Sequence, residues 1–364
     1  MTGNQRPVIA LLAAPETSAS VLYGLYDVLL SVGSVFGDMT TGQPGDALLD
    51  VRIVADGPDP FRCVGGVLIE PHADIADGSP VDVAIVCDMY TPIDVPPRGR
   101  HVREVDWLRR VHGQGALVAS VCTGSLMLAE AGLLDGREAG CHWAYRDLFR
   151  RHYPRVRMTE DTILNLASEA DGVITAGGVT AWQDLALHLI ARLCGPVEAI
   201  RTAKVFLLAG HEDGQRPFAA MTRPSQTRDA VIAHCQTWIE QNYAVANPVA
   251  AMIDRSGLTP RTFGRRFRAA TGHLPIEYVH AVRIEEARRI LESGSAPTEG
   301  VGYEVGYEDP TFFRRLFKRT TGMSPAAYRR KVAGIITGSN EGAADPGARP
   351  SGPGSGRSTT FTVA

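Results

Sequence analysis

Residues 259–278 read T-P-R-T-F-G-R-R-F-R-A-A-T-G-H-L-P-I-E-Y, and fifty positions later residues 309–328 read D-P-T-F-F-R-R-L-F-K-R-T-T-G-M-S-P-A-A-Y. The two stretches align without a gap. Identical residues stay in register at Pro260/Pro310, Phe263/Phe313, Arg265/Arg315, Phe267/Phe317, Gly272/Gly322, Pro275/Pro325 and Tyr278/Tyr328. The repeat predicts two copies of one small helical unit.

Each copy has the pattern of a helix-turn-helix. In the first copy, residues 250–255 form a short helix, and a turn separates it from a second helix that begins at the cap Thr259 and the first-turn proline Pro260. Phe263 and Phe267 lie four positions apart and share the face that we expect to be buried. The corresponding parts of the second copy are residues 303–305 before the turn, the cap Asp309, the proline Pro310 and the aromatic pair Phe313/Phe317.

Opposite these phenylalanines, the second helix of each copy carries basic side chains. They are Arg261, Arg265 and Arg268 in the first copy, and Arg314, Arg315 and Lys318 in the second. Such a helix fits the major groove of double-stranded DNA, where arginine can bond guanine O6 and N7. The amphipathic residues 276–293 between the copies are long enough to fix their separation, so we expect the two helices to enter successive major grooves about 34 Å apart. One chain then reads a bipartite site.

The charge of the chain is distributed unevenly. The net charge is −3, but residues 225–331 contain 16 Lys/Arg against 11 Asp/Glu, which leaves about −8 on the remainder. A basic segment on an otherwise acidic chain fits an electrostatic footprint for phosphates.

Up to residue 208, short apolar runs alternate with amphipathic stretches. The apolar runs, which are typical of buried strands, are residues 8–13, 51–54, 81–86, 116–121 and 173–175. The amphipathic stretches, which are typical of helices, are residues 21–32, 102–112, 125–131, 143–151 and 181–192. This alternation implies a mainly parallel sheet covered on both faces. We therefore expect a doubly wound, flavodoxin-like α/β domain, followed by an all-α domain with two helix-turn-helix units.

Composition places the domain boundaries. Residues 7–210 form the α/β domain, and residues 211–226, which lose apolar periodicity and contain glycine and two prolines, form a linker. Residues 227–331 form the helical domain. Residues 334–364 are rich in Gly, Pro and Ser and cannot bury enough apolar surface to order themselves, so we expect a disordered tail.

Targeting and cysteine patterns point to the cytoplasm. The first residues show no basic region followed by an apolar run, and no apolar stretch reaches the roughly 20 residues of a membrane helix. We expect a cytoplasmic protein without a membrane partner, located at the nucleoid when bound to DNA. The cysteines lack C-x-x-C spacing, so we expect reduced thiols with no metal and no cofactor. They are Cys63, Cys87, Cys122, Cys141, Cys194 and Cys235.

Residues 227–330 resemble the DNA-binding domain of the AraC/XylS family of transcription regulators, through both helix-turn-helix units, the connecting helix and the closing T-G-M-S-P-A-A-Y-R-R. Position by position, the resemblance implies base contacts at Arg261, Thr262, Arg265, Thr311, Phe312 and Arg315. It leaves Arg266, Arg268, Arg314 and Lys318 as phosphate contacts or structural surface. Gly302 departs from the family's alanine. A helical glycine costs about 0.5–1 kcal/mol, which predicts a less rigid second unit.

The α/β part contains a cysteine at a strand-to-helix turn. In A-L-V-A-S-V-C-T-G-S, residues 116–125, Cys122 follows the strand directly, where the amides of a helix N-terminus can lower a thiol pKa. His142, in G-C-H-W, could reach Cys122 as a base. A buried cysteine and a core histidine are commoner than a catalytic pair, so both interpretations stay open.

The runs S-V-C-T-G-S-L-M-L-A-E-A-G-L-L-D-G-R-E-A-G-C-H-W and D-G-V-I-T-A-G-G-V-T-A-W-Q-D-L-A-L-H-L-I resemble the PfpI-like, class I glutamine amidotransferase-like superfamily, and the similarity spans residues 7–208. Fusion of such a domain to an AraC-type reader is a known regulator architecture. Two positions depart from the catalytic pattern. Val21 stands where the superfamily has its acid, with Glu16 five residues upstream, and residues 87–90 replace a Gly-Gly pair with C-D-M-Y. The missing acid predicts that the chain is not an enzyme.

A ligand pocket can persist without this chemistry. Parallel sheets bind ligands at the carboxyl ends of their strands, where we expect Cys122, His142, Tyr90, Thr180 and Trp182. Trp182 could form part of a cation–π wall, or it could be a core aromatic. Related regulators respond to small amines, amino acids or quaternary ammonium compounds, so the resemblance implies a small-molecule effector. Control by abundance alone is the alternative.

The sequence as a whole predicts a sequence-specific transcription regulator. Its C-terminal domain reads a promoter, its N-terminal domain senses a metabolite and forms a homodimer, and RNA polymerase is a further partner. The alternative is a cysteine-dependent amidohydrolase or glyoxalase-like enzyme with an accessory DNA-binding domain, and a third interpretation has Cys122 sensing oxidants. Because residues 261–262 are Arg-Thr and residues 311–312 are Thr-Phe, the two units should read different half-sites.

Overall fold

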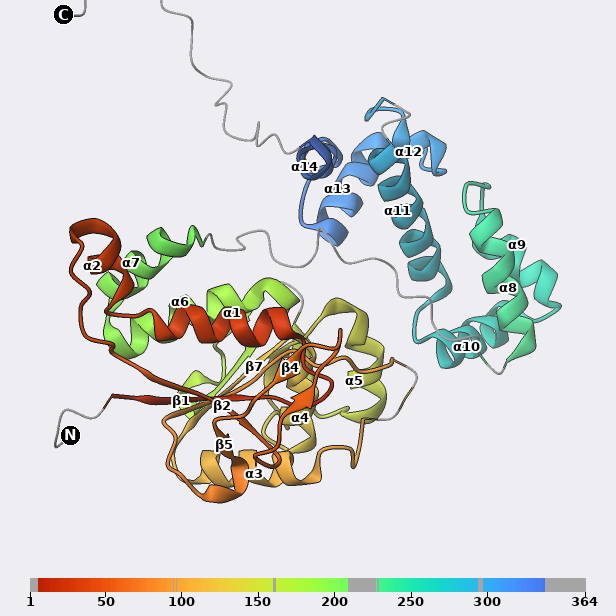
Figure 1. The fold of residues 1–364 in the computed structure, drawn as a ribbon. Coiled ribbons are helices and arrows are strands. Elements are labelled where there is room, and N and C mark those ends of the chain that lie inside the picture. The colour runs from red at the N-terminus through yellow and green to blue at the C-terminus, as the bar shows by residue number, and fades with distance from the viewer. Residues whose placement is uncertain are drawn as a thin grey trace, which may run out of the picture.

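The computed structural model describes residues 6–93, 95, 97–159, 162–208, 227, 229–293 and 297–337. An α/β domain comes first and an all-helical domain follows, as the sequence predicts (Figure 1). The predicted linker, residues 211–226, lies outside the described residues, and so does the predicted tail from residue 338 onward. The last helix ends at Thr337, so the first four residues assigned to the tail are helical, which corrects that boundary.

A seven-stranded sheet forms the centre of the α/β domain, in the order β10-β11-β7-β6-β1-β2-β5. Its strands are β1 (Val8–Leu12), β2 (Asp50–Ala55), β5 (Ala73–Asp74), β6 (Val83–Val86), β7 (Leu117–Val121), β10 (Leu164–Asn165) and β11 (Val173–Ala176). All neighbouring pairs are parallel except β10 and β11. The five predicted apolar runs are β1, β2, β6, β7 and β11, and their parallel pairing brings their carboxyl ends to one edge of the sheet.

Two small sheets lie beside the central one. They pair β3 (Phe61–Arg62) with β4 (Leu68–Ile69), and β8 (Glu138–Gly140) with β9 (Arg157–Thr159).

Helices cover both faces of the central sheet, with α1 and α6 on one face and α3 and α4 on the other (Figure 1). The helices of this domain are α1 (Ala19–Leu30), α2 (Val35–Thr41), α3 (Val102–Gly113), α4 (Ser125–Glu130), α5 (Arg146–His152), α6 (Trp182–Cys194) and α7 (Pro196–Phe206). Strand β1 shows how two cores arise. Ile9 and Leu11 pack with α1 and α6, whereas Ala10 and Leu12 pack with α3 and α4, because successive strand residues point to opposite faces.

The helices α2 and α7 are absent from the sequence prediction. They contact each other, but α2 buries no residue, and the apolar face of α7 is only partly buried, with Thr202 as its one fully buried residue. Among the described residues, no single helix is long and apolar enough to cross a membrane. The pair α1 and α2, bent by 65°, meets both criteria only when the two helices are taken together.

The second domain contains two hydrophobic cores that share one helix. Its described helices are α8 (Ala230–Gln241), α9 (Pro248–Ser256), α10 (Pro260–Thr271), α11 (Pro275–Ser293), α12 (Val301–Glu304), α13 (Pro310–Thr321) and α14 (Pro325–Thr337). Tyr278 and Val279, early in α11, pack with α8, α9 and α10. Ile284 and Leu291, later in the same helix, pack with α12, α13 and α14. Helix α11 therefore belongs to both units.

The fifty-residue repeat is confirmed by side-chain geometry. Phe267 and Tyr278 meet edge to face with ring centroids 5.4 Å apart, and the corresponding rings of the second copy are 5.6 Å apart. Gly272 and its counterpart Gly322 end the second helix of each unit with φ of 78° and 82°. This left-handed conformation strains other residues, which explains why both copies have glycine there.

Gly302, the departure from the family pattern, has a packing role. A Cβ at this position would lie 2.8 Å from the ring of Phe313, which is itself buried. Aligned on the left-handed turn glycines Gly257 and Gly306, the corresponding residue of the first copy is Ile253, which is partly buried. The glycine therefore allows the short helix α12 to lie directly against α13.

Candidate DNA-binding interface and strand-end cluster

The second helix of the first unit, α10, begins at the predicted cap. The hydroxyl of Thr259 accepts a hydrogen bond from the backbone N–H of Thr262 at 3.4 Å, and Pro260 occupies the first turn. Phe263 and Phe267 are fully buried beneath the helix. The side chains left exposed include Arg261, Arg265 and Arg268.

Helix α13 has the same construction in the second unit. The carboxylate of Asp309 accepts a hydrogen bond from the N–H of Thr311 at 2.8 Å, while Phe313 and Phe317 are buried. The exposed side chains include Thr311, Phe312, Arg314, Arg315 and Lys318. We refer to α10 and α13 as the recognition helices.

Most cations on the recognition helices are not neutralised. With the carboxylates of the described residues, no ion pair is formed by Arg261, Arg265, Arg268, Arg314, Arg315 or Lys318. Two helix faces with free cations are suited to meet phosphates and guanine edges.

Arg266 differs from these residues. Its Nε and Nη2 atoms donate to the two carboxylate oxygens of Asp229 at 2.8 and 2.7 Å, and Asp229 is the N-cap of α8. The guanidinium also holds the pKa of Asp229 below its usual range. The corresponding residue of the second copy is Leu316. In the structure Arg266 therefore ties α10 to α8.

One side of Phe312 packs against two other aromatic rings. Its ring lies 5.7 Å from that of His280 and 5.7 Å from that of Tyr307, and its side chain is 38% exposed. The exposed part remains available for the base contact that the family resemblance implies.

Cys122 occupies a sharp turn at the end of β7. Its backbone φ is 53°, a conformation that non-glycine residues rarely adopt, and its side chain is 2% exposed. Gly124 follows closely, and a Cβ there would lie 2.6 Å from the carbonyl oxygen of Val86 and 2.8 Å from that of Cys87. Only glycine fits so near the neighbouring strand β6. The turn therefore requires the glycine that follows Cys122 and Thr123 in the sequence C-T-G.

A carboxylate that sequence reasoning missed lies beside the cysteine. Asp88 follows the adjacent strand β6 and is 7% exposed. Its oxygens accept a hydrogen bond from the hydroxyl of Ser18 at 2.6 Å and lie 2.7 Å from the hydroxyl of Thr123. Burial raises the pKa of the Cys122 thiol well above its usual range, and the negative charge of Asp88 raises it further. The thiol is therefore protonated at neutral pH.

Asp88 does not stand at the superfamily position of the acid. Val21, at the superfamily position, is fully buried, and Glu16 pairs with Arg100 at 2.9 Å. Asp88 supplies a carboxylate from a different strand end. The sequence did contain a signal for Asp88, because residues 87–90 directly follow a predicted buried strand. Residues in such positions lie together at one edge of a parallel sheet.

Two further titratable side chains lie near Asp88. His142 uses its Nδ1 to accept the N–H of Ala144 at 3.3 Å, and burial lowers its pKa. Among the described residues, no hydrogen bond joins His142 to Cys122. Tyr145 donates its hydroxyl to the carbonyl of Thr91 at 2.6 Å, and burial is the main cause that raises its pKa to about 12.

The other predicted pocket residues lie at the same edge in different surroundings. Tyr90 is 61% exposed, and Thr180 is exposed in the turn before α6. The ring of Trp182 packs directly against Gly24 of α1. A Cβ at Gly24 would lie only 2.8 Å from this ring. That contact favours the core interpretation of the tryptophan, while the pocket formed by the five residues together stays a prediction.

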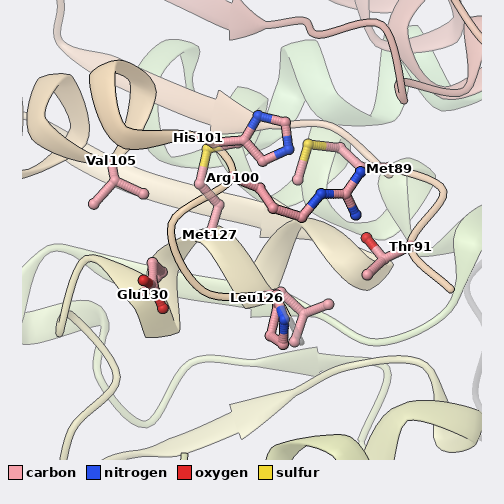
Figure 2. Close-up of a pocket in the computed structure, with 9 residues that line it drawn as sticks. Met89, Thr91, Arg100, His101, Val105, Leu126, Met127 and Glu130 are labelled. Carbon is pink, nitrogen blue, oxygen red and sulfur yellow. The ribbon is translucent and has the colours of Figure 1, made fainter. Parts of the chain in front are cut away.

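A cavity lies beside this cluster, between the segment after β6 and helices α3 and α4 (Figure 2). It is small, with a volume of about 20 Å³, it is partly open to solvent, and none of the five predicted residues lines it. Met89, Leu126 and Met127 form its apolar part. Arg100 and Glu130 lie at its margin, where Arg100 pairs with Glu16, and Glu130 accepts the hydroxyl of Tyr153 at 2.8 Å.

Comparison with known proteins gives matches for both domains. Residues 27–192 match the DJ-1/PfpI family, and residues 252–331 match a helix-turn-helix domain. The HTH-type transcriptional regulator CdhR of Pseudomonas aeruginosa is 32% identical over 231 residues, which are 62% of this chain and 66% of that protein. The HTH-type transcriptional regulator GlxA of Rhizobium meliloti is 26% identical over 228 residues, 62% of this chain and 68% of that protein.

An enzyme is also similar to part of the chain. The isonitrile hydratase of Pseudomonas putida is 32% identical over 190 residues, which are 51% of this chain and 72% of the hydratase. The matches to the two regulators span about two thirds of their lengths. Together with the fold and the repeated helical unit, these similarities show that the chain belongs to the HTH-type transcriptional regulators in which a DJ-1/PfpI domain is joined to an AraC-type helix-turn-helix domain.

Proposed function

We propose that this regulator reads an asymmetric promoter site in double-stranded DNA with α10 and α13, under the control of a small metabolite bound to the α/β domain. One observation carries the proposal: two basic helix faces are free of ion pairs within the described residues, and they differ in sequence. The first begins with Arg261 and Thr262, the second with Thr311 and Phe312. Different side chains select different bases, so the half-sites differ within one protomer.

Arg265→Ala and Arg315→Ala test this assignment. Each is expected to weaken specific binding by about 1–3 kcal/mol and to relax base preference only in its own half-site, because a bidentate contact to guanine is lost. The measurement is fluorescence anisotropy on an operator selected from random duplexes, and on versions scrambled in one half.

Arg289→Ala is the matched control for charge. Arg289 is an exposed cation of α11 that pairs with Glu286. Its removal is expected to lower affinity slightly for all sequences. If Arg265→Ala and Arg315→Ala behave like this control, the recognition helices are wrongly assigned.

We further propose that the α/β domain forms the homodimer and that RNA polymerase contacts the DNA-bound protein, in the cytoplasm and at the nucleoid. The strand-end edge supports a sensing role, since open α/β sheets take ligands there. Exposed apolar side chains on the contacting helices α2 and α7 support a self-association surface. They are Met39, Val197 and Ile200, with exposures of 68%, 59% and 56%.

A cysteine-dependent enzyme is the second candidate, favoured by the similarity to a hydratase. We consider it weaker because the nucleophile of such enzymes is the thiolate, and this thiol is buried and protonated. The same protonation argues against oxidant sensing at Cys122.

Turnover assays on the full chain separate the two candidates. The wild type is expected to show no turnover of isonitriles, amides or 2-oxoaldehydes, and Cys122→Ala is expected to retain operator binding. Turnover that is present in the wild type and lost in both Cys122→Ala and Asp88→Asn would establish the enzyme instead.

A further inference from the structure

A buried arginine lies where the two helix-turn-helix units meet. Arg283, in the middle of α11, is 7% exposed. Its Nε donates to the carbonyl of Tyr243 at 2.7 Å, and its Nη2 donates to that of Val245 at 3.0 Å. Both carbonyls belong to the loop between α8 and α9 in the first unit. Among the described residues no carboxylate pairs with this guanidinium, so the buried cation relies on the loop carbonyls and on an aromatic ring.

That ring comes from the second unit. Tyr307, in the turn between α12 and α13, is 5% exposed, and its ring centroid lies 5.0 Å from the guanidinium carbon of Arg283. The neighbouring Gly306 has φ of 89°, and a Cβ there would lie 2.7 Å from the carbonyl oxygen of Ala244 and 2.9 Å from Nη2 of Arg283. The turn of the second unit therefore lies directly against the loop of the first.

The same tyrosine is connected to the recognition helix α13. Its hydroxyl lies 2.9 Å from Nδ1 of His280, and the two rings stack with centroids 5.8 Å apart. Phe312, in the first turn of α13, contacts both rings at 5.7 Å. A displacement of Tyr307 would therefore move the start of α13 relative to the first unit.

This joint is formed by Arg283, Tyr307, Gly306 and His280. Gly306 has a left-handed counterpart in Gly257 of the first turn, but the residue after Gly257 is Leu258 instead of a tyrosine, and fifty residues before Arg283 stands Ala233. A part of each unit's own scaffold would appear in both copies, as the phenylalanine pairs do. The single occurrence of the arginine and the tyrosine indicates a role between the units.

We infer that Arg283 is a positioning residue that sets the distance and rotation between α10 and α13, and thereby the half-site spacing that one protomer accepts. The inference rests on the proposed function of these helices as readers. One base pair moves a half-site by about 3.4 Å and turns it by about 35° around the duplex, so a rigid joint rejects altered spacings. A loosened joint tolerates them, but it binds the best spacing less tightly because the second helix is no longer held in place.

Arg283→Gln tests the inference on the selected operator, with one or two base pairs added to or removed from the spacer. Wild type is expected to show one preferred spacing. The variant is expected to lose about tenfold in affinity at that spacing, to change little at the others, and to bind the isolated first half-site within about twofold of wild type.

Arg288→Gln is the matched control. Arg288 lies on the same helix, is 5% exposed, and packs 5.9 Å from the ring of Tyr328 inside the second unit. Its replacement is expected to shift affinity by one common factor at every spacing, because the joint is intact.

A common shift at all spacings in Arg283→Gln would overturn the inference. If that variant does not fold, Tyr307→Leu removes the ring from the second-unit side and leaves both carbonyl bonds of Arg283. The same flattened spacing profile is expected, and a profile as steep as wild type would also overturn it. A wild-type chain without any bipartite preference would refute the proposed function instead, so the two failures differ.

Discussion

Two helical glycines of the DNA-binding domain have opposite surroundings. A Cβ at Gly302 would lie 2.8 Å from the ring of Phe313, whereas one at Gly264, in α10, would have no described atom within 4 Å. Gly302→Ala is expected to destabilise the domain by about 1–3 kcal/mol, because Phe313 must shift in a packed core. Gly264→Ala is expected to stabilise it by about 0.5–1 kcal/mol through helix propensity alone.

Urea titrations followed by methyl resonances of the helical domain measure both effects. The two variants are controls for each other, since each adds the same methyl group to a helix. Stabilisation by both would show that α12 has room for alanine, and that the contact with Phe313 does not determine the cost.

At the scale of single residues, the sequence predicts exposure but not long-range contacts. The exposure of Arg265 and Arg315 follows from helical periodicity, because the buried phenylalanines fix the opposite face. Asp88 and Arg283 act through partners 24 or more positions away in the chain, and periodicity carries no information on such contacts. Arg266 is similar, since only the fold brings it to Asp229.

At the scale of secondary-structure elements, the sequence predicts the strands and helices that bury a long, regular series of apolar residues. The strands β1, β2, β6, β7 and β11 are continuous apolar runs, and α11 is amphipathic because it contacts two cores. The two- and three-residue strands are too short to show a period of two. Helix α2 buries no residue and α7 only partly buries its apolar face, so their formation depends on tertiary contacts that the sequence does not display.

At the scale of the whole molecule, each domain contains a partly buried histidine with a lowered pKa. In the α/β domain burial lowers the pKa of His142, and the charge of Asp88 opposes this shift in part. In the helical domain burial lowers the pKa of His280, and the charges of Arg283 on α11 and Arg319 on α13 lower it further. Among the described residues, the neutral rings of Tyr307 and Phe312 also face His280.

Acidification from about pH 7.5 to about pH 5.5 is therefore expected to destabilise both domains. Above the ordinary histidine pKa of about 6.5 both rings are neutral in the folded and unfolded chain, and below it the unfolded chain binds the proton first. Urea titrations followed by methyl resonances of each domain measure the two slopes. His280→Asn is expected to reduce the slope of the helical domain alone, and His142→Asn that of the α/β domain alone. If His280→Asn leaves the helical slope unchanged, other groups carry the pH dependence, and protonation of His280 does not weaken the contact between the two units.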